Sequence, residues 1–219
     1  MVGKRNLLGD SMSEEVVEEV VEEVPQDEPI PGIGTLVFGK WDASEIACDD
    51  PGLAPYINIT TIGTPHTGGR HANLWFGKSK LSLIERFVNS LMRTGQFSGK
   101  KQNCVKSLEE ALDHIHAKTG GNPLDVLVAA IVNSAPCEET TRIRFGAVSQ
   151  PKAVDVSPSR RLDIALRHLA NGCTSATRKS KRSLTQGIIN EIKKASEYDV
   201  SSFAVSKREE MERIAASSR

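Results

Sequence analysis

The sequence predicts a mainly helical protein, with a bundle of about six helices, a protruding β-hairpin arm and a disordered acidic N-terminal tail. Apolar residues recur at helical spacing, between residues that start and stop helices, through most of the chain after residue 82. Only residues 141–156 replace this spacing with the alternation typical of a strand pair. A chain of 219 residues is long enough for one core of ordinary size.

The net charge of zero conceals two electrostatically opposite pieces. Residues 1–60 hold 13 acidic and 3 basic side chains, whereas residues 61–219 hold 15 acidic and 25 basic ones. A basic body of this kind is typical of proteins that bind a phosphate-rich partner, and such a partner would repel the acidic piece.

The acidic piece centres on SEEVVEEVVEEVPQDEP, residues 13–29. Its valines fall at helical spacing, but the glutamates repel one another and valine is a mediocre helix former, so we expect disorder. A helix that binds a partner is the alternative. Proline and glycine in residues 29–34 predict a linker. We therefore divide the chain into an acidic tail and linker (1–34), an N-terminal extension that docks on the body (35–78) and a helical domain with the arm (79–219).

The first two helices are predicted over residues 82–95 and 100–121. Ser82 and Glu85 match a capping box at the start of the first, and Gly95 is expected to stop it in the left-handed conformation. Gly120 is expected to stop the second helix. The residues expected to face the core are Ile84, Phe87, Val88, Leu91, Cys104, Leu108, Ala111 and Ile115.

The next two helices each open with a capping residue followed by proline. Asn122 stands at the start of the third helix, which is expected to end before Pro136. Ser157 stands at the start of the fourth, and Gly172 is expected to stop it. The residues expected to be buried are Leu124, Leu127, Val128, Ile131, Leu162, Ala165, Leu166 and Leu169.

Two further helices are predicted to open at Ser183 and Ser206. Gln186 and Glu209 stand three residues later, at the second position of a capping box. Six amphipathic helices of this kind pack together as a bundle.

The stretch RIRFGAVSQPKAVDVSPSRR, residues 142–161, departs from the helical pattern. Arg142 and Arg144 alternate with apolar residues, so the arginines share one side of an extended strand. We predict a hairpin whose tip lies near Gly146–Pro151, with Ile143–Phe145 paired to Ala153–Val156. Such an arm has little core of its own and needs a partner to hold it. Two interpretations stay open: a surface hairpin with solvated arginines, or an arm whose cations contact phosphate.

The sequence lacks the side-chain patterns that catalysis, metal binding or nucleotide binding require. GQFSGKK, residues 95–101, resembles a phosphate-binding loop, but its spacing is one residue short and Lys101 replaces the required hydroxyl. The histidines and the four cysteines lack the spacing of metal ligands. We therefore expect no enzyme activity, no cofactor and no metal. The cysteines expected to be small buried apolar residues are Cys48, Cys104, Cys137 and Cys173.

No apolar run approaches the roughly 18 residues needed to span a bilayer. The first residues are followed by glutamates where a secretion signal requires an apolar stretch. We therefore expect a cytoplasmic protein with no membrane partner.

Several motifs together carry a family resemblance. VNSLMRTGQFSGKK followed by LEEAL, then GNPLDVLVAAIVNSAP, then the hairpin running into AVDVSPSRR, resemble the universal small-subunit ribosomal protein family called seven in bacteria and five in eukaryotes. The resemblance extends from LVFGKW to EEMERIAASSR, roughly Thr35 to Arg219, and favours the eukaryotic branch.

The resemblance implies a structural component of the small ribosomal subunit that catalyses nothing. Members of the family bind rRNA of the 3′ major domain, support assembly of the head and line the exit-tRNA site and the mRNA path. The implied partners are small-subunit rRNA, neighbouring head proteins, exit-site tRNA and mRNA. The residues expected to bind RNA are Arg70, Lys78, Lys80, Lys100, Lys101, Arg142, Arg144, Lys152, Arg160, Arg161, Lys179, Lys181 and Arg182.

A free-standing helical regulator that binds nucleic acid is the rival interpretation. SPSRRLDIALRHL, residues 157–169, could serve as a recognition helix. Its arginines lie mainly at its start, and it has few Asn or Gln side chains to read base edges, so the ribosomal interpretation is favoured.

Overall fold

The computed structural model describes residues 36–43, 46, 48–59, 65–146 and 148–219. All of the described residues belong to one compact unit, Pro31–Arg219. The acidic tail and linker predicted for residues 1–34 lie outside the described residues. The boundaries predicted at residues 34 and 78 stay predictions.

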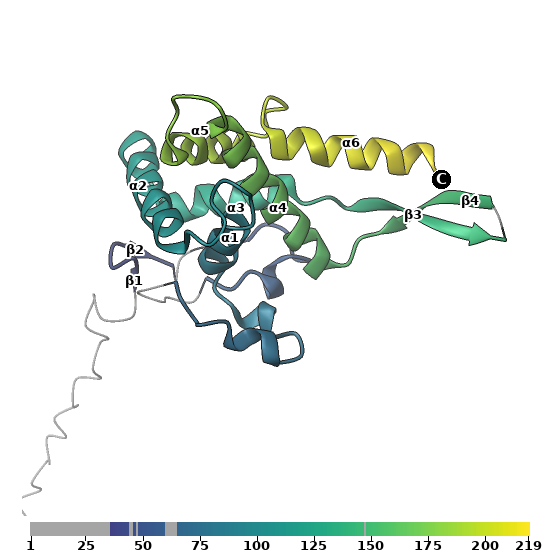
Figure 1. Ribbon diagram of the computed structural model, residues 1–219, viewed down its shortest axis with the longest axis horizontal. Helices are drawn as coiled ribbons and strands as arrows, with labels where there is room; N and C mark the ends of the chain where they lie inside the picture. The colour runs from purple at the N-terminus through teal and green to yellow at the C-terminus, as the bar shows by residue number, and fades with distance from the viewer. Residues whose placement is uncertain (1–35, 44–45, 47, 60–64, 147) are drawn as a thin grey trace, which may run out of the picture. The chain divides into compact units, whose positions relative to one another are not determined.

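The described residues form six α-helices and two antiparallel hairpins (Figure 1), which confirms the predicted mainly helical class with an arm. The helices are α1 (Leu83–Leu91), α2 (Lys101–Thr119), α3 (Pro123–Ser134), α4 (Pro158–Thr177), α5 (Leu184–Ser196) and α6 (Phe203–Ser217). The strands are β1 (Leu36–Val37), β2 (Trp41–Asp42), β3 (Glu138–Phe145) and β4 (Val148–Asp155). Three short 3₁₀ turns precede α1, at Ala54–Tyr56, Arg70–Asn73 and Gly77–Lys80.

Helix α5 is central to the bundle and packs against α2, α3 and α4. Its Ile188 and Ile192 are fully buried, as is Leu108 of α2, and Leu166 of α4 is only 2% exposed. Every apolar residue expected to face the core on the first four helices is buried. The spacing of apolar residues therefore predicts the core correctly.

The β1–β2 hairpin packs on the helical body. Val37 and Trp41 are buried in the core. Lys40 Nζ lies 3.0 Å from Glu109 Oε1 and 2.9 Å from Asp113 Oδ2, both on α2. Apolar burial and ion pairs thus attach the N-terminal segment to the bundle.

The start and end of α1 differ from the prediction. Ser82 is the N-cap but its side chain makes no capping bond, and the Glu85 carboxylate binds Thr67 and Lys101 instead of the backbone at the start of the helix. The helix ends at Leu91, and Gly95 does not adopt a positive φ. The predicted capping box and left-handed stop are therefore wrong, whereas Gly120 does end α2, with φ of 70°.

Gly172 does not stop α4, which continues to Thr177. The glycine is buried where α4 meets α5, and a Cβ there would lie 2.6 Å from Cδ of Glu191. Glu191 Oε1 in turn accepts hydrogen bonds from Ser202 Oγ at 2.8 Å and Ala204 N at 2.9 Å, at the start of α6. Gly172 is therefore a close-packing residue rather than a helix terminator.

The other predicted helix starts are mostly confirmed. Asn122 accepts a hydrogen bond from Leu124 N at 3.1 Å, and Ser183 accepts one from Gln186 N at 3.2 Å. Helix α4 begins after Ser157 as expected, without a side-chain cap. Ser206 is wrong as a start, because α6 begins after Ser202, whose buried hydroxyl is fixed by Glu191.

The arm is longer and more tightly turned than predicted. Strands β3 and β4 pair from Glu138 opposite Asp155 to Phe145 opposite Val148, and Gly146 directly follows the last paired residue of β3. The predicted tip at Gly146–Pro151 is wrong, as is the predicted pairing, because Ile143 lies opposite Gln150. Gly146 has φ of 61°, the left-handed conformation that a tight hairpin turn requires. Proline fits within β4 because a two-stranded ribbon has only edge strands.

Helix α6 runs alongside the arm and supports its base (Figure 1). Ala153 N donates to the carbonyl of Ser218 at 3.4 Å, and Arg219 forms an ion pair with Glu138. Glu212 accepts a hydrogen bond from Cys137 N at 2.9 Å. The base of the arm thus has a partner within the chain.

The cysteines differ in exposure. Cys104 and Cys173 are fully buried, and burial raises the pKa of both thiols. Cys48 is half-buried, and Cys137 is exposed at the start of the arm. The expectation of four buried cysteines is therefore wrong for Cys137.

Candidate nucleic-acid interface

Two arginines of the arm are free to bind an anion. Arg142 and Arg144 are exposed, and the register places them on one face with Ser149 and Pro151. Within the described residues neither guanidinium has a carboxylate partner. Lys152, also exposed, lies opposite Thr141 on the other face. The arm therefore presents cations along both faces.

Arg160, at the base of the arm, forms an ion pair with the Glu139 carboxylate. Its Nε and Nη2 donate to the two oxygens of Glu139 at 2.7 and 2.6 Å. These bonds lower the pKa of the Glu139 carboxyl and raise the pKa of the Arg160 guanidinium. Because Arg160 is exposed, a phosphate could replace this partner without unfolding the chain.

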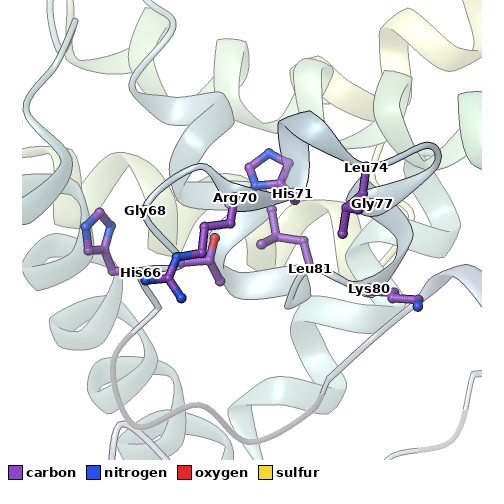
Figure 2. Close-up of a pocket in the computed structure, with 9 residues that line it drawn as sticks. His66, Gly68, Arg70, His71, Leu74, Gly77, Lys80 and Leu81 are labelled. Carbon is purple, nitrogen blue, oxygen red and sulfur yellow. The ribbon is translucent and has the colours of Figure 1, made fainter.

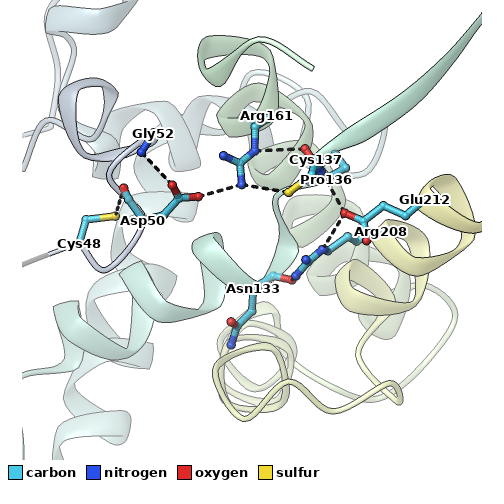
Figure 3. A network of polar contacts seen from close by, with 9 residues as sticks. All are labelled: Cys48, Asp50, Gly52, Asn133, Pro136, Cys137, Arg161, Arg208 and Glu212. Carbon is cyan, nitrogen blue, oxygen red and sulfur yellow. Dashed lines mark hydrogen bonds and ion pairs between the residues drawn. The ribbon is translucent and has the colours of Figure 1, made fainter. Parts of the chain in front are cut away.

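Arg161, its neighbour, is mostly buried and joins three segments of the chain (Figure 3). It donates to Asp50 Oδ2 at 2.8 Å and to the carbonyl of Pro136 at 3.2 Å, and its Nη2 lies 3.6 Å from Cys137 Sγ. Burial alone would raise the pKa of Asp50, but the hydrogen bonds from Gly52 N and Arg161 outweigh it and lower that pKa. These contacts give Arg161 a structural role.

Lys101 also forms an ion pair within the protein. Its Nζ lies 2.8 Å from Oε1 of Glu85, which is only 1 % exposed and also accepts bonds from Thr67 N at 3.0 Å and Thr67 Oγ1 at 3.1 Å. Burial would raise the pKa of Glu85, but the bonds from Lys101 and Thr67 outweigh it, and the pKa is lowered. The ion pair ties α2 to α1, while adjacent Lys100 is exposed.

Lys78 forms part of a second ion-pair group. Its Nζ lies 2.5 Å from Asp163 Oδ2, and Arg86 Nη2 lies 2.7 Å from Asp163 Oδ1. Burial would raise the pKa of Asp163, but the two cations outweigh it and lower the pKa. Lys78 remains half-exposed beside this group.

The other predicted contacts are exposed side chains in three places. Arg70 and Lys80 belong to the 3₁₀ turns before α1, and Lys100 lies just before α2. The loop between α4 and α5 carries the rest, which are Lys179, Lys181 and Arg182. None of these side chains has a carboxylate partner within the described residues.

The structure brings together two further arginines that the sequence did not reveal. Arg93, just after α1, and Arg167 of α4 line a polar hollow of about 500 Å³ with Lys78 and Asn171. The polar residues Asp163, Arg167 and Asn171 recur every four positions on α4, which is the one signal that could have indicated this surface. Nothing in the sequence connects Arg93 to it.

Comparison with known proteins decides the family. The model of the family described as Ribosomal protein S7p/S5e matches residues 58–219. The chain is 50% identical to the small ribosomal subunit protein uS7 of Picrophilus torridus over 184 residues, which cover 84% of this chain and 98% of the relative. The chain belongs to the ribosomal S7 family.

Other uS7 relatives agree. Identity is 46% to the Thermoplasma volcanium protein, covering 84% of this chain and all of the relative, and 48% to the Archaeoglobus fulgidus protein, covering 84% and 95%. These relatives are archaeal and fit the archaeal and eukaryotic branch. Within the described part of the chain, no helix is both long and apolar enough to cross a bilayer.

Proposed function

We propose that this chain is a structural, non-catalytic component of the small ribosomal subunit that binds rRNA of the head, the 3′ major domain. Membership of the ribosomal S7 family supports this role, as does the chain's similarity to small ribosomal subunit proteins uS7. The observation that carries RNA binding is the arm, where Arg142 and Arg144 are exposed on one face of a hairpin held by α6. Guanidinium groups bind phosphate in a bidentate geometry, and such contacts position a protein on RNA.

The proposed RNA-binding residues fall into three groups. Lys78 and Arg160 would release the carboxylate that each now binds and bind phosphate in its place. Lys101 and Arg161 would support RNA binding indirectly, because their ion pairs hold together the segments that carry the exposed cations. The cations available without any exchange are Arg70, Lys80, Lys100, Arg142, Arg144, Lys152, Lys179, Lys181 and Arg182.

We further propose that the turn at Gly146 reaches exit-site tRNA and the mRNA path, and that the body contacts neighbouring head proteins. The likeness to the S7 family supports these finer assignments. A long two-stranded arm extends the reach of a helical bundle toward RNA that the bundle itself does not touch.

The test is the salt dependence of binding to a transcript of the 3′ major domain. Arg142→Gln with Arg144→Gln should weaken binding and reduce the slope of log affinity against log salt by about 1.4–1.8 units, since each phosphate contact contributes about 0.7–0.9. The matched control is Lys106→Gln with Lys118→Gln, which removes the same charge from exposed sites on α2. An unchanged slope in the arm variant would refute the assignment. A wild-type chain that sediments apart from small subunits and binds duplex DNA would favour the regulator instead.

A further inference from the structure

Three consecutive large apolar side chains are exposed in the 3₁₀ lobe, residues 65–81. Leu74 is 66% exposed, Trp75 94% and Phe76 51%. The rings of Trp75 and Phe76 have centroids 6.3 Å apart. The other tryptophan, Trp41, is only 7% exposed. A contiguous apolar patch bordered by polar groups is typical of a binding surface.

The backbone of the lobe holds this patch in a defined position. Leu74 N donates to the carbonyl of His71 at 3.3 Å, and Gly77 N donates to the carbonyl of Leu74 at 3.1 Å. Gly77 is buried so close to the His71 carbonyl that a Cβ there would clash with it. Phe76 adopts φ of 54°, and its carbonyl accepts a bond from Ser79 N at 3.0 Å. The exposed rings are thus carried by hydrogen-bonded turns.

Two adjacent hollows lie beside the patch. The larger, of about 630 Å³, is lined by Arg70, Lys80 and Leu74, among others, and Figure 2 shows the two cations on opposite sides of it. The smaller, of about 470 Å³, is lined by Trp75, Phe76 and Lys78. His71, Leu74 and Gly77 line both, so the two hollows adjoin at these residues.

The charge of the lobe indicates the kind of partner. Residues 65–84 contain no aspartate or glutamate, but include Arg70, Lys78 and Lys80. Lys78 is paired with Asp163, whereas Arg70 and Lys80 have no carboxylate partner within the described residues. Cations beside an exposed aromatic ring complement single-stranded RNA, which offers unpaired bases to stack and phosphates to bind.

We infer that the 3₁₀ lobe is a second RNA-contact site, which binds an unpaired stretch of RNA by stacking a base on Trp75 while Arg70 and Lys80 bind the adjoining phosphates. This inference rests on the proposed rRNA-binding function and adds a contact to bases, whereas the arm contacts phosphate. A double helix would not engage this site, because its bases are already stacked on one another.

Fluorescence tests this site directly, because the chain has two tryptophans of opposite exposure. The full-length chain is titrated with an unstructured twelve-nucleotide oligouridylate, and separately with the same strand annealed to oligoadenylate. The single strand should quench Trp75 saturably, and the duplex should not. Trp75→Phe retains a ring for stacking and leaves only buried Trp41 as fluorophore, so its emission should not respond.

Affinity measured by anisotropy of end-labelled oligouridylate supplies the second readout. Trp75→Ala and Trp75→Leu should each weaken binding at least about fivefold, the low end of the loss expected when base stacking on an aromatic ring is removed. Trp75→Phe should retain most of the affinity. None of these changes should alter the salt slope, whereas Lys80→Gln should reduce it by about 0.7 units. The Trp75 side chain is almost fully exposed, so the fold should tolerate all three substitutions of this residue.

Three results would overturn the inference. The first is that the single strand does not quench Trp75, and the second is that the duplex quenches it equally. The third is that Trp75→Leu binds oligouridylate with wild-type affinity, which would assign the patch to apolar docking of a protein. If one of these occurs while the arm variant still loses rRNA binding, the proposed function stands and only the site at Trp75 fails. If the arm variant and Trp75→Leu both keep wild-type binding to RNA, the proposed function and the site at Trp75 are both refuted.

Discussion

Replacing Lys101 with glutamine should destabilise the fold, although the sequence predicted a phosphate contact at this residue. Lys101 Nζ is 2.8 Å from Oε1 of Glu85, whose side chain is 1% exposed. The other carboxylate oxygen, Oε2, is buried and has no hydrogen-bond partner. Without the ammonium, the carboxylate would keep only the two bonds from Thr67.

The expected loss follows from this geometry. Removing one partner of a fully buried ion pair costs about 3–5 kcal/mol, because an uncompensated charge remains. Lys101 is 22% exposed, so solvent screens part of the interaction, and we expect about 2–3 kcal/mol. For a chain of this size that corresponds to a fall in Tm of about 4–12 °C.

Urea denaturation of the full-length chain measures this loss as a lower midpoint with an unchanged m-value. The matched control is Lys100→Gln, because Lys100 is exposed and only its 3.4 Å bond to the carbonyl of Gln96 would be lost. The control should stay within about 0.5 kcal/mol of wild type but reduce the salt slope for rRNA. If Lys101→Gln instead kept the wild-type midpoint and reduced the salt slope, the ion pair would be energetically unimportant and Lys101 would bind phosphate.

Two further changes test the packing and the pH dependence of the fold. Gly172→Ala should lower the free energy of unfolding by about 1–3 kcal/mol, because the added Cβ would displace Glu191 from the start of α6. The control Gly95→Ala adds a Cβ to open space and should lower it by less than about 0.5 kcal/mol. Equal urea midpoints in the two variants would contradict this prediction. The pKa values of Glu85 and Asp163 are lower in the folded protein than in the unfolded chain, where they are about 4. The two carboxylates therefore stabilise the fold fully above pH of about 4, and this stabilisation is lost as the pH falls through the lower folded values. Asp163→Asn should therefore show a shallower acid-induced loss of stability than wild type, and an identical acid profile would show that this carboxylate contributes nothing.

The class, the core and the arm can be predicted from sequence because they depend on neighbours along the chain. Burial of Leu108 and Leu166 follows from a period near that of the helix, and the caps at Asn122 and Ser183 act within three residues. The alternation that begins at Arg142 places its arginines on one face for the same reason. The order of residues by itself thus determined a helical bundle with a basic arm, and the motifs were specific enough to indicate the S7 family.

Tertiary structure alone decided which of the cations predicted to bind RNA are exposed. Adjacent Lys100 and Lys101 look equivalent in sequence, as do Arg160 and Arg161, yet one of each pair is exposed and the other is bound inside the fold. The partners of Lys101 and Arg161 are carboxylates on other segments, and the strength of an ion pair depends on distance and burial in space, neither of which sequence spacing reports. Gly172 is the packing counterpart, because the sequence does not show whether a glycine ends a helix with a positive φ, as Gly120 does, or lies within a helix where a neighbouring element leaves no room for a Cβ.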